Sequence, residues 1–361
     1  MTHVRATVRP FVLAAIAAIA TGALLAGCAA GPEPSGPASS EPVVLTLVTH
    51  DSFALGEGVL EDFTAETGIE VRVHAAGNAG ALVNSLILTK DSPLGDVVFG
   101  IDNTFASRPV EAGVLEPYVS GALTAAEAPY LLEGLGREEL TPVTSGDVCV
   151  NADLAWFAEH DLAVPETLED LIDPTYRGLT VVEAANTSSP GLAFLLATIG
   201  TFGEPGWQDY WRALVANDVK VAAGWSDAYY VDFSGPSSEG DRPLVVSYAS
   251  SPLAEITDPA APAPTGVLLD TCFRQTEYAG VIAGTAHPVE ARQLVDFLVS
   301  ERVQEDVPTS MWVLPVLQSA ELPEAWAAHV ALPESPVTID SASIEAHREQ
   351  WIGEWAAIAV P

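Results

Sequence analysis

The segment GWSDAYYVDF at positions 224–233 gathers one tryptophan and two adjacent tyrosines beside small residues. Core packing is the ordinary interpretation of Trp225, Tyr229 and Tyr230, because aromatic side chains are large apolar groups. A second interpretation is a binding surface, because aromatic faces stack on flat rings and attract cations. The rest of the chain has to decide between the two.

A second candidate binding segment is TSSPG at positions 187–191. Pro190 suits the first position of a helix and Ser189 suits the N-cap, so this segment predicts a helix start with free backbone N–H groups. Such an end can bind an anion, and plain capping without a ligand is the alternative. From these residues alone, both interpretations stay open.

Catalytic signatures are absent from the sequence. It contains no phosphate-binding glycine loop, zinc-protease motif or nucleophile elbow. The consecutive residues His50, Asp51 and Ser52 cannot form a catalytic relay, because neighbours on a strand point to opposite faces. The histidines have no metal-ligand spacing. We therefore expect no catalytic residue, no metal site and no cofactor.

The amino terminus predicts export. A basic stretch precedes the apolar run FVLAAIAAIATGALLAG, which ends at Cys28, and this is the layout of a signal peptide over residues 1–28. The residues LAGC before and at Cys28 resemble the bacterial lipobox, in which the cysteine is lipidated; an ordinary secretory signal is the alternative. Residues 29–42, rich in proline, glycine and serine, predict a flexible tether. We expect a lipid-anchored protein on the extracytoplasmic face of the bacterial cell membrane.

Charge and cysteine content narrow the function classes further. The chain has 14 Lys and Arg against 49 Asp and Glu, a formal charge of −35, which disfavours nucleic acid as a partner. Because 48% of its 361 residues are hydrophobic, the chain can still bury a core, and its composition is not that of a disordered protein. The length predicts two domains, and we expect a monomer. Outside the membrane, Cys149 and Cys272 predict a disulfide, with two separate buried thiols as the alternative.

Strand and helix patterns alternate along the chain. Positions 43–49, 69–75 and 95–102 predict strands, and positions 58–68 and 79–90 predict helices between them. This order predicts an α/β fold with a mainly parallel sheet, whose ligands bind at the carboxyl ends of the strands. Further on, we expect strands at 178–184 and 243–252 and helices at 290–306 and 343–360.

Several colinear motifs together carry a family likeness. They are VTHDSF, VVFGIDNTF, TSSPGLAFLL, GWSDAYYVDF, VVSYASSP, VPTSMWVLPV and HREQWIGEW. Over residues 43–355 this series resembles the periplasmic thiamine-binding proteins of bacterial ABC importers, in a superfamily that also binds ferric iron, polyamines and sulfate. The resemblance implies a type 2 periplasmic-binding-protein fold of two lobes, with the ligand in the cleft between them. It divides the chain into lobe 1 at 43–145, lobe 2 at 146–275, and a return to lobe 1 with C-terminal helices at 276–361.

The resemblance also assigns roles to site residues. Trp225, Tyr229 and Trp312 would stack on the aminopyrimidine and thiazolium rings of thiamine. Asp102 would accept hydrogen bonds from the ligand or offset its positive charge. Other expected wall residues are polar or small: Asp51, Ser52, Ser188, Ser189, Gly191, Tyr248 and Ser250. Of these, Ser188, Ser189 and Gly191 at the helix start would receive the hydroxyethyl end of the ligand, or a phosphate if the ligand carries one. Two departures are His50, where a tyrosine is expected, and Ala254, where another aromatic residue is expected.

The function that follows is capture rather than catalysis. The ligand would be thiamine or a thiamine phosphate, and the partner would be the membrane permease of an ABC transporter. One alternative is a ferric-iron-binding protein that uses Tyr229 and Tyr230 as phenolate ligands. A second alternative, an enzyme instead of a binding protein, is a lipoprotein that acts on thiamine-like compounds.

Overall fold

The computed structural model describes residues 42–258 and 261–360. The predicted signal peptide at 1–28, its Cys28, and the predicted tether up to residue 41 lie outside the described residues. Within the described part of the chain, no helix is both long enough and apolar enough to cross a membrane.

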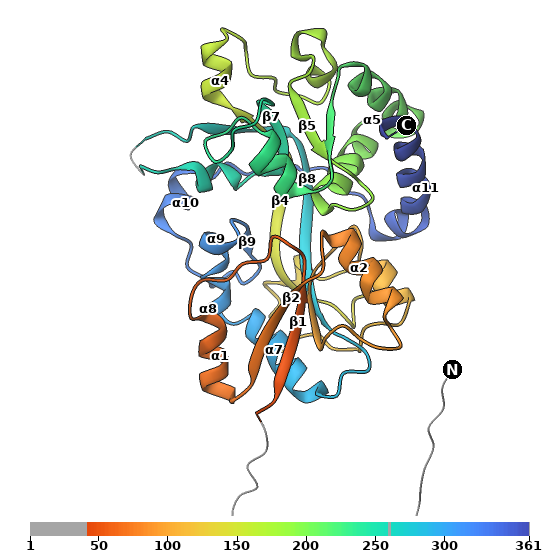
Figure 1. Ribbon diagram of the computed structural model, residues 1–361, viewed down its shortest axis with the longest axis vertical. Coiled ribbons are helices and arrows are strands. Elements are labelled where there is room, and N and C mark those ends of the chain that lie inside the picture. Colours follow the sequence, from red (N-terminus) through yellow and green to blue (C-terminus); the bar gives the residue numbers. More distant parts are fainter. Residues whose placement is uncertain (1–41, 259–260, 361) are drawn as a thin grey trace, which may run out of the picture. The chain divides into compact units, whose positions relative to one another are not determined.

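The first described segment forms the strand–helix–strand–helix–strand unit that its sequence predicts (Figure 1). Strand β1 pairs in parallel with both β2 and β3. β3 is buried along its whole length, as its apolar residues Val97–Ile101 favour, and its last residue, Asp102, is a buried carboxylate. The elements are β1 (Val44–Thr49), α1 (Val59–Thr67), β2 (Glu70–Ala75), α2 (Ala79–Leu88) and β3 (Val97–Asp102).

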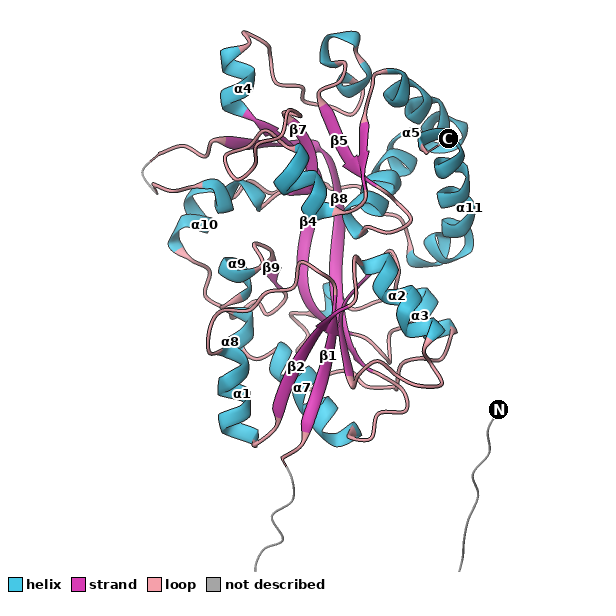
Figure 2. Cartoon of the chain, in the orientation of Figure 1, coloured by secondary structure: helices cyan, strands magenta, loops and turns pink. Residues whose placement is uncertain are grey.

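Two long antiparallel strands, β4 (Thr141–Asp153) and β8 (Thr265–Val281), run through the centre of the sheet (Figure 2). The strand order is β2-β1-β3-β8-β4-β7-β5-β6, and β9 also pairs with β4. β3 and β7 each pair antiparallel with a central strand, so the expectation of a mainly parallel sheet is wrong: the sheet is mixed. The remaining strands are β5 (Thr180–Glu183), β6 (Lys220–Ala222), β7 (Leu244–Tyr248) and β9 (Leu314–Pro315).

Helices pack around the sheet (Figure 1). The predicted helix at 290–306 is divided in two, because Val299 and Ser300 leave the helical path between α7 and α8. The remaining helices are α3 (Ser107–Glu111), α4 (Leu154–Glu159), α5 (Ser189–Ala216), α6 (Trp225–Asp227), α7 (Pro288–Leu298), α8 (Glu301–Gln304), α9 (Val307–Ser310), α10 (Glu324–His329) and α11 (Ser341–Ala359).

The carboxyl-terminal helix α11 packs against α5, which belongs to the predicted lobe 2. Trp355 of α11 meets Trp211 of α5 edge to face, with ring centroids 5.7 Å apart. Buried Arg348 of α11 also donates to the carbonyl of Thr104 and to the hydroxyl of Ser107, in the predicted lobe 1. α11 therefore contacts both predicted lobes instead of simply returning to lobe 1, and the boundaries at 43–145, 146–275 and 276–361 stay predictions.

The core has separate apolar clusters. In one, Phe63 of α1 and Phe297 of α7 lie with ring centroids 5.0 Å apart, beneath buried Leu45 and Leu47 of β1. A larger cluster surrounds α5, whose amino-terminal half is buried on nearly every side. Burial of this kind is the main favourable term in folding, and here it fixes α1, α5 and α7 against the sheet.

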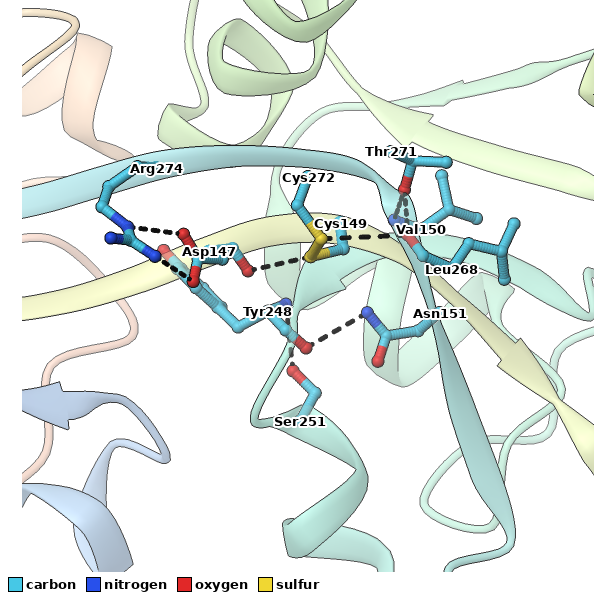
Figure 3. The surroundings of a disulfide bond; sticks show 10 residues. All are labelled: Asp147, Cys149, Val150, Asn151, Tyr248, Ser251, Leu268, Thr271, Cys272 and Arg274. Atoms are coloured by element: carbon cyan, nitrogen blue, oxygen red, sulfur yellow. Dashed lines mark hydrogen bonds and ion pairs between the residues drawn. A yellow bond between two sulfur atoms is a disulfide. The ribbon is translucent and has the colours of Figure 1, made fainter. Parts of the chain in front are cut away.

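Cys149 of β4 and Cys272 of β8 form a disulfide between the two central strands (Figure 3). Both cysteines are buried and their Cα atoms are 4.2 Å apart. At this point the pairing shifts: Val148 is opposite Phe273, but Val150 is opposite Leu268, so β8 carries extra residues. The disulfide closes this bulge.

Replacing both cysteines with alanine should lower the free energy of unfolding by roughly 2–5 kcal/mol, because the crosslink spans 123 residues and restricts the unfolded chain. Denaturant unfolding followed by circular dichroism measures the change. Wild-type protein unfolded with a reducing agent should match the double variant. An unfolding midpoint unchanged in both cases would contradict a structural role for the crosslink.

Candidate functional site

A pocket of about 340 Å³ opens at the carboxyl ends of several strands. The residues after β1 form one wall, with the start of α2, and the starts of α5 and α6 form another. The end of β7, Glu277 of β8 and the segment 310–313 complete it. These elements come from both predicted lobes, so a ligand here would touch both.

Eight of the eleven predicted ligand-binding residues line the pocket: Asp51, Ser52, Ser188, Ser189, Trp225, Tyr229, Tyr248 and Trp312. The other three lie directly behind it. Asp102 bonds to Ser189, the hydroxyl of Ser250 donates to the carbonyl of Trp312 at 2.5 Å, and the N–H of Gly191 faces the hydroxyl of Ser188 at 3.5 Å.

The start of α5 differs in detail from its prediction. The N-cap is Ser188, whose hydroxyl accepts from the N–H of Gly191, and Ser189 is already the first helical residue. Gly191 has to be glycine for a packing reason, because a Cβ there would lie 2.6 Å from the carbonyl oxygen of Glu183. The close approach of α5 to the end of β5 therefore sets where Ser188 and Ser189 lie.

Asp102, the last residue of β3, is completely buried, and it holds the start of α5. One carboxylate oxygen accepts from the N–H and the hydroxyl of Thr104, at 2.6 and 2.5 Å, and the other accepts from the hydroxyl of Ser189. Burial raises the pKa of Asp102, while these hydrogen bonds oppose the rise. Its place behind the wall makes it a support for Ser189 rather than part of the pocket surface.

His50 and Glu277 lie against each other in the pocket lining, with 3.3 Å between Nε2 and Oε1. Burial raises the pKa of Glu277, but the charge of His50 and the hydrogen bonds from His50 and Thr144 bring it below its usual value. Gly100 makes room for the imidazole: its φ is +96°, and a Cβ there would lie 2.1 Å from His50 Cδ2. A larger residue at Gly100 would therefore displace His50.

Trp225 and Tyr229 stack on each other, with centroids 5.1 Å apart and planes at 20°. The indole N–H of Trp225 donates to the hydroxyl of Ser247 at 2.9 Å, and the hydroxyl of Tyr229 donates to Glu255 at 2.9 Å. Tyr229 is only 2% exposed, so it supports Trp225 from behind. Both interpretations of the aromatic segment thus apply: Tyr229 packs, and Trp225 faces the pocket.

Trp312 lines the pocket from the segment between α9 and β9. Its φ of +57° lies in the left-handed region, which is costly for a bulky side chain and is retained where the surroundings impose it. The hydrogen bond from Ser250 to its carbonyl is one such constraint. The backbone at Trp312 is thus held in position by the loop that follows β7.

The charge around the pocket is negative. Asp51 and Glu277 line it, Asp102 and Glu255 are buried just behind, and His50 is the only basic residue among the described lining residues. No Lys or Arg lines it. Carboxylates in a partly desolvated cleft attract cations more strongly than they would in water.

A metal site is not assembled in the described part of the chain, where no three His, Cys, Asp or Glu side chains converge to hold an ion. Tyr229 and Tyr230 both line the pocket, but the hydroxyl of Tyr229 is a donor to Glu255. Burial raises the pKa of Tyr229, and so does the charge of Glu255, which disfavours the phenolate that iron requires.

Several pocket residues were not assigned by the sequence. Trp225 and its neighbours were found through their composition. The remaining lining residues were given no role, although most of them lie in the quoted motifs: Phe53, Ala54, Asn78, Ala79, Pro190, Ser226, Ser251, Glu277, Ser310, Met311 and Val313. His50 and Ala254 were noted only as departures from the resemblance, and Tyr230 only as an iron ligand. A likeness in the order of motifs indicates which segments meet, but it does not give the depth of each side chain.

A family model for bacterial extracellular solute-binding proteins matches residues 92–333. The chain belongs to this family. It is 28% identical over 324 residues to a thiamine-binding periplasmic protein of Salmonella typhimurium, covering 88% of this chain and 94% of the relative. A protein of the same name from Escherichia coli is 29% identical over 320 residues, with 86% and 92% covered.

A solved structure titled periplasmic thiamin binding protein superposes with a TM-score of 0.76 at 27% identity, over 88% of this chain and 96% of that one. This chain thus has the type 2 periplasmic-binding-protein fold.

Glu183 is a buried carboxyl group without a hydrogen-bond partner for its side chain in the described structure, and it lies near this site. It ends β5, is 1% exposed, and neither carboxylate oxygen has a hydrogen-bond partner within the described structure. Burial raises the pKa of Glu183 well above its usual value. The folded protein therefore holds this proton at pH values where the unfolded chain releases it.

Glu183→Gln should make stability less dependent on pH. Because the pKa of Glu183 is raised by folding, the wild type loses stability as pH rises above about 4.3, by at most about 1.4 kcal/mol per pH unit from this group. The glutamine variant lacks that loss, so its advantage in Tm should grow from pH 4.5 to pH 8. Thermal unfolding across this range tests it, with Glu159→Gln, an exposed residue of α4, as the control. Equal pH profiles for all three proteins would contradict the prediction.

Proposed function

We propose that this solute-binding protein captures thiamine or a thiamine phosphate and delivers it to the permease of an ABC importer. The observation that carries the proposal is the pocket itself: Trp225 and Trp312 line an acidic cleft whose described lining residues include no lysine or arginine. The names of the similar proteins from Salmonella and Escherichia support the same ligand. On this proposal the protein is not an enzyme.

The chemistry of thiamine suits the two kinds of surface in the pocket. Its thiazolium ring is a permanent cation, which gains from aromatic faces and from nearby carboxylates. Its aminopyrimidine is flat and carries donors and acceptors. Trp225 and Trp312 would stack on the rings, and Asp51, Ser52 and Tyr248 would bond to their edges.

The start of α5 would receive the hydroxyethyl end of the ligand. Ser188 and Ser189 line the pocket there, and a helix start presents partial positive charge to an oxygen or a phosphate. The hydroxyl of Ser189 donates to Asp102, so its oxygen is left to accept from the ligand. This geometry suits the alcohol of the hydroxyethyl end, which can donate a hydrogen bond to the Ser189 oxygen. A phosphate in the same place would have only backbone N–H groups as hydrogen-bond donors.

Delivery follows from contacts with both sides of the cleft. A ligand that touches both predicted lobes favours the closed form by its differential affinity. The closed protein, a monomer, would then dock on the permease. A lipid on Cys28 and the tether at 29–42 would hold it beside that partner at the extracytoplasmic face of the membrane, which raises its effective concentration.

Iron has weaker support as the solute. The superfamily includes ferric-iron binders and the two tyrosines are adjacent, but the described residues offer no additional His or carboxylate set and Tyr229 is engaged as a donor. The alternative of an enzyme acting on thiamine-like compounds has no observation in its favour.

Trp225→Ala should weaken thiamine binding about tenfold or more, because it removes the stacking face and with it roughly 1–2 kcal/mol of cation–π and stacking free energy. Isothermal titration calorimetry with thiamine and its mono- and diphosphates measures it, and the wild type should bind with sub-micromolar affinity. Trp156→Ala removes an indole far from the pocket, stacked on His160, and should bind like the wild type.

A wild-type protein that shows no heat with any thiamine form would overturn the proposed function. Ferric citrate serves as the competing solute in the same experiment, and a visible colour with saturable iron binding would replace thiamine by iron.

A further inference from the structure

Tyr230 stands at the edge of the pocket in an unusual position. It belongs to a π-helical turn, Ala228–Asp232, that follows α6 directly. Its ring is nearly perpendicular to both Trp225 (82°) and Tyr229 (81°), with centroids 5.3 Å away in each case. Tyr230 therefore does not extend the Trp225–Tyr229 stack but forms a second aromatic wall at a right angle to it.

The exposure of Tyr230 separates it from its neighbour. Tyr229 is 2% exposed and bonds to Glu255, whereas Tyr230 is 49% exposed and still lines the pocket. Its hydroxyl has no hydrogen-bond partner among the described residues. A large apolar ring left half in water, without a polar anchor, gains by covering something when the pocket is filled.

Ala254 lines the same pocket as Tyr230 and lies in a short 3-10 turn, Ser251–Glu255. This turn contacts the aromatic cluster, because Glu255 accepts from the hydroxyl of Tyr229 at 2.9 Å. Burial raises the pKa of Tyr230, and so does the charge of Glu255 in the same turn. The pocket lining thus has a large side chain at Tyr230 and, at Ala254, one that ends at its Cβ.

We infer that Tyr230 is a specificity-determining residue that closes the ligand pocket over the space left by Ala254. The inference rests on the proposed function and deepens it. With Trp225 it makes an aromatic corner that encloses a flat cation on two sides. An aromatic side chain placed at position 254 would fill the same space from the opposite border.

The test compares five variants by calorimetry with free thiamine. Tyr230→Ala should weaken binding about tenfold, as expected for one aromatic contact to a cation. Tyr230→Phe should recover most of that loss, because the ring and not the unpaired hydroxyl makes the contact. The matched control is Val231→Ala, since Val231 is the next residue, is 62% exposed and does not line the pocket.

Ala254→Tyr tests whether the two positions share one space. Alone, it should weaken binding by crowding Tyr230. In the Tyr230→Ala background it should restore affinity, so the two changes are strongly non-additive. Thermal unfolding of each variant separates a loss of binding from a loss of folding.

The outcomes distinguish this inference from the proposed function. If the wild type binds thiamine and Tyr230→Ala binds it equally well, the inference is wrong and the proposed function stands. Additive losses at Tyr230 and Ala254 would overturn the shared space. If the wild type binds no thiamine, the proposed function and the inference fall together.

Discussion

The pairing of β4 with β8 is the constraint on which the rest of the structure depends. These two strands pair from Thr141 to Asp153, and they join the parallel strands β1–β3 on one side to β5–β7 on the other. Both strands are buried over most of their length, so each must satisfy its backbone in the ladder. The Cys149–Cys272 disulfide fixes their register where the ladder is interrupted.

This central pair also positions the pocket. Ala249 packs against the disulfide, and its N–H bonds to the carbonyl of Asp147 in β4. Two residues on either side of Ala249 hold the pocket tryptophans: Ser247 of β7 accepts from the indole of Trp225, and Ser250 in the loop after β7 donates to the carbonyl of Trp312. The two tryptophans are therefore held by one short segment that packs against the disulfide.

Much of this fold could be predicted from the sequence, because local patterns carry it. The strand–helix alternation of residues 43–102 and the glycine that ends α1 depend on neighbours a few positions away. The mixed sheet could not be, since the pairing of β4 with β8 joins segments more than a hundred residues apart. The same holds for the site: composition identified Trp225, but only the tertiary packing shows that Asp102 lies behind Ser189 and that Tyr230, not Tyr229, is the exposed ring.

The electrostatics of the cleft connect the fold to the choice of solute. Asp51 and Glu277 line the pocket, and no lysine or arginine among the described lining residues offsets their charge. Closing such a cleft around a neutral or anionic solute would leave these carboxylates with less water and no new partner, which is costly. Closing it around a cation replaces the lost water with an opposite charge. A cationic solute is thus the one for which closure of this cleft, and not only entry into it, is favourable.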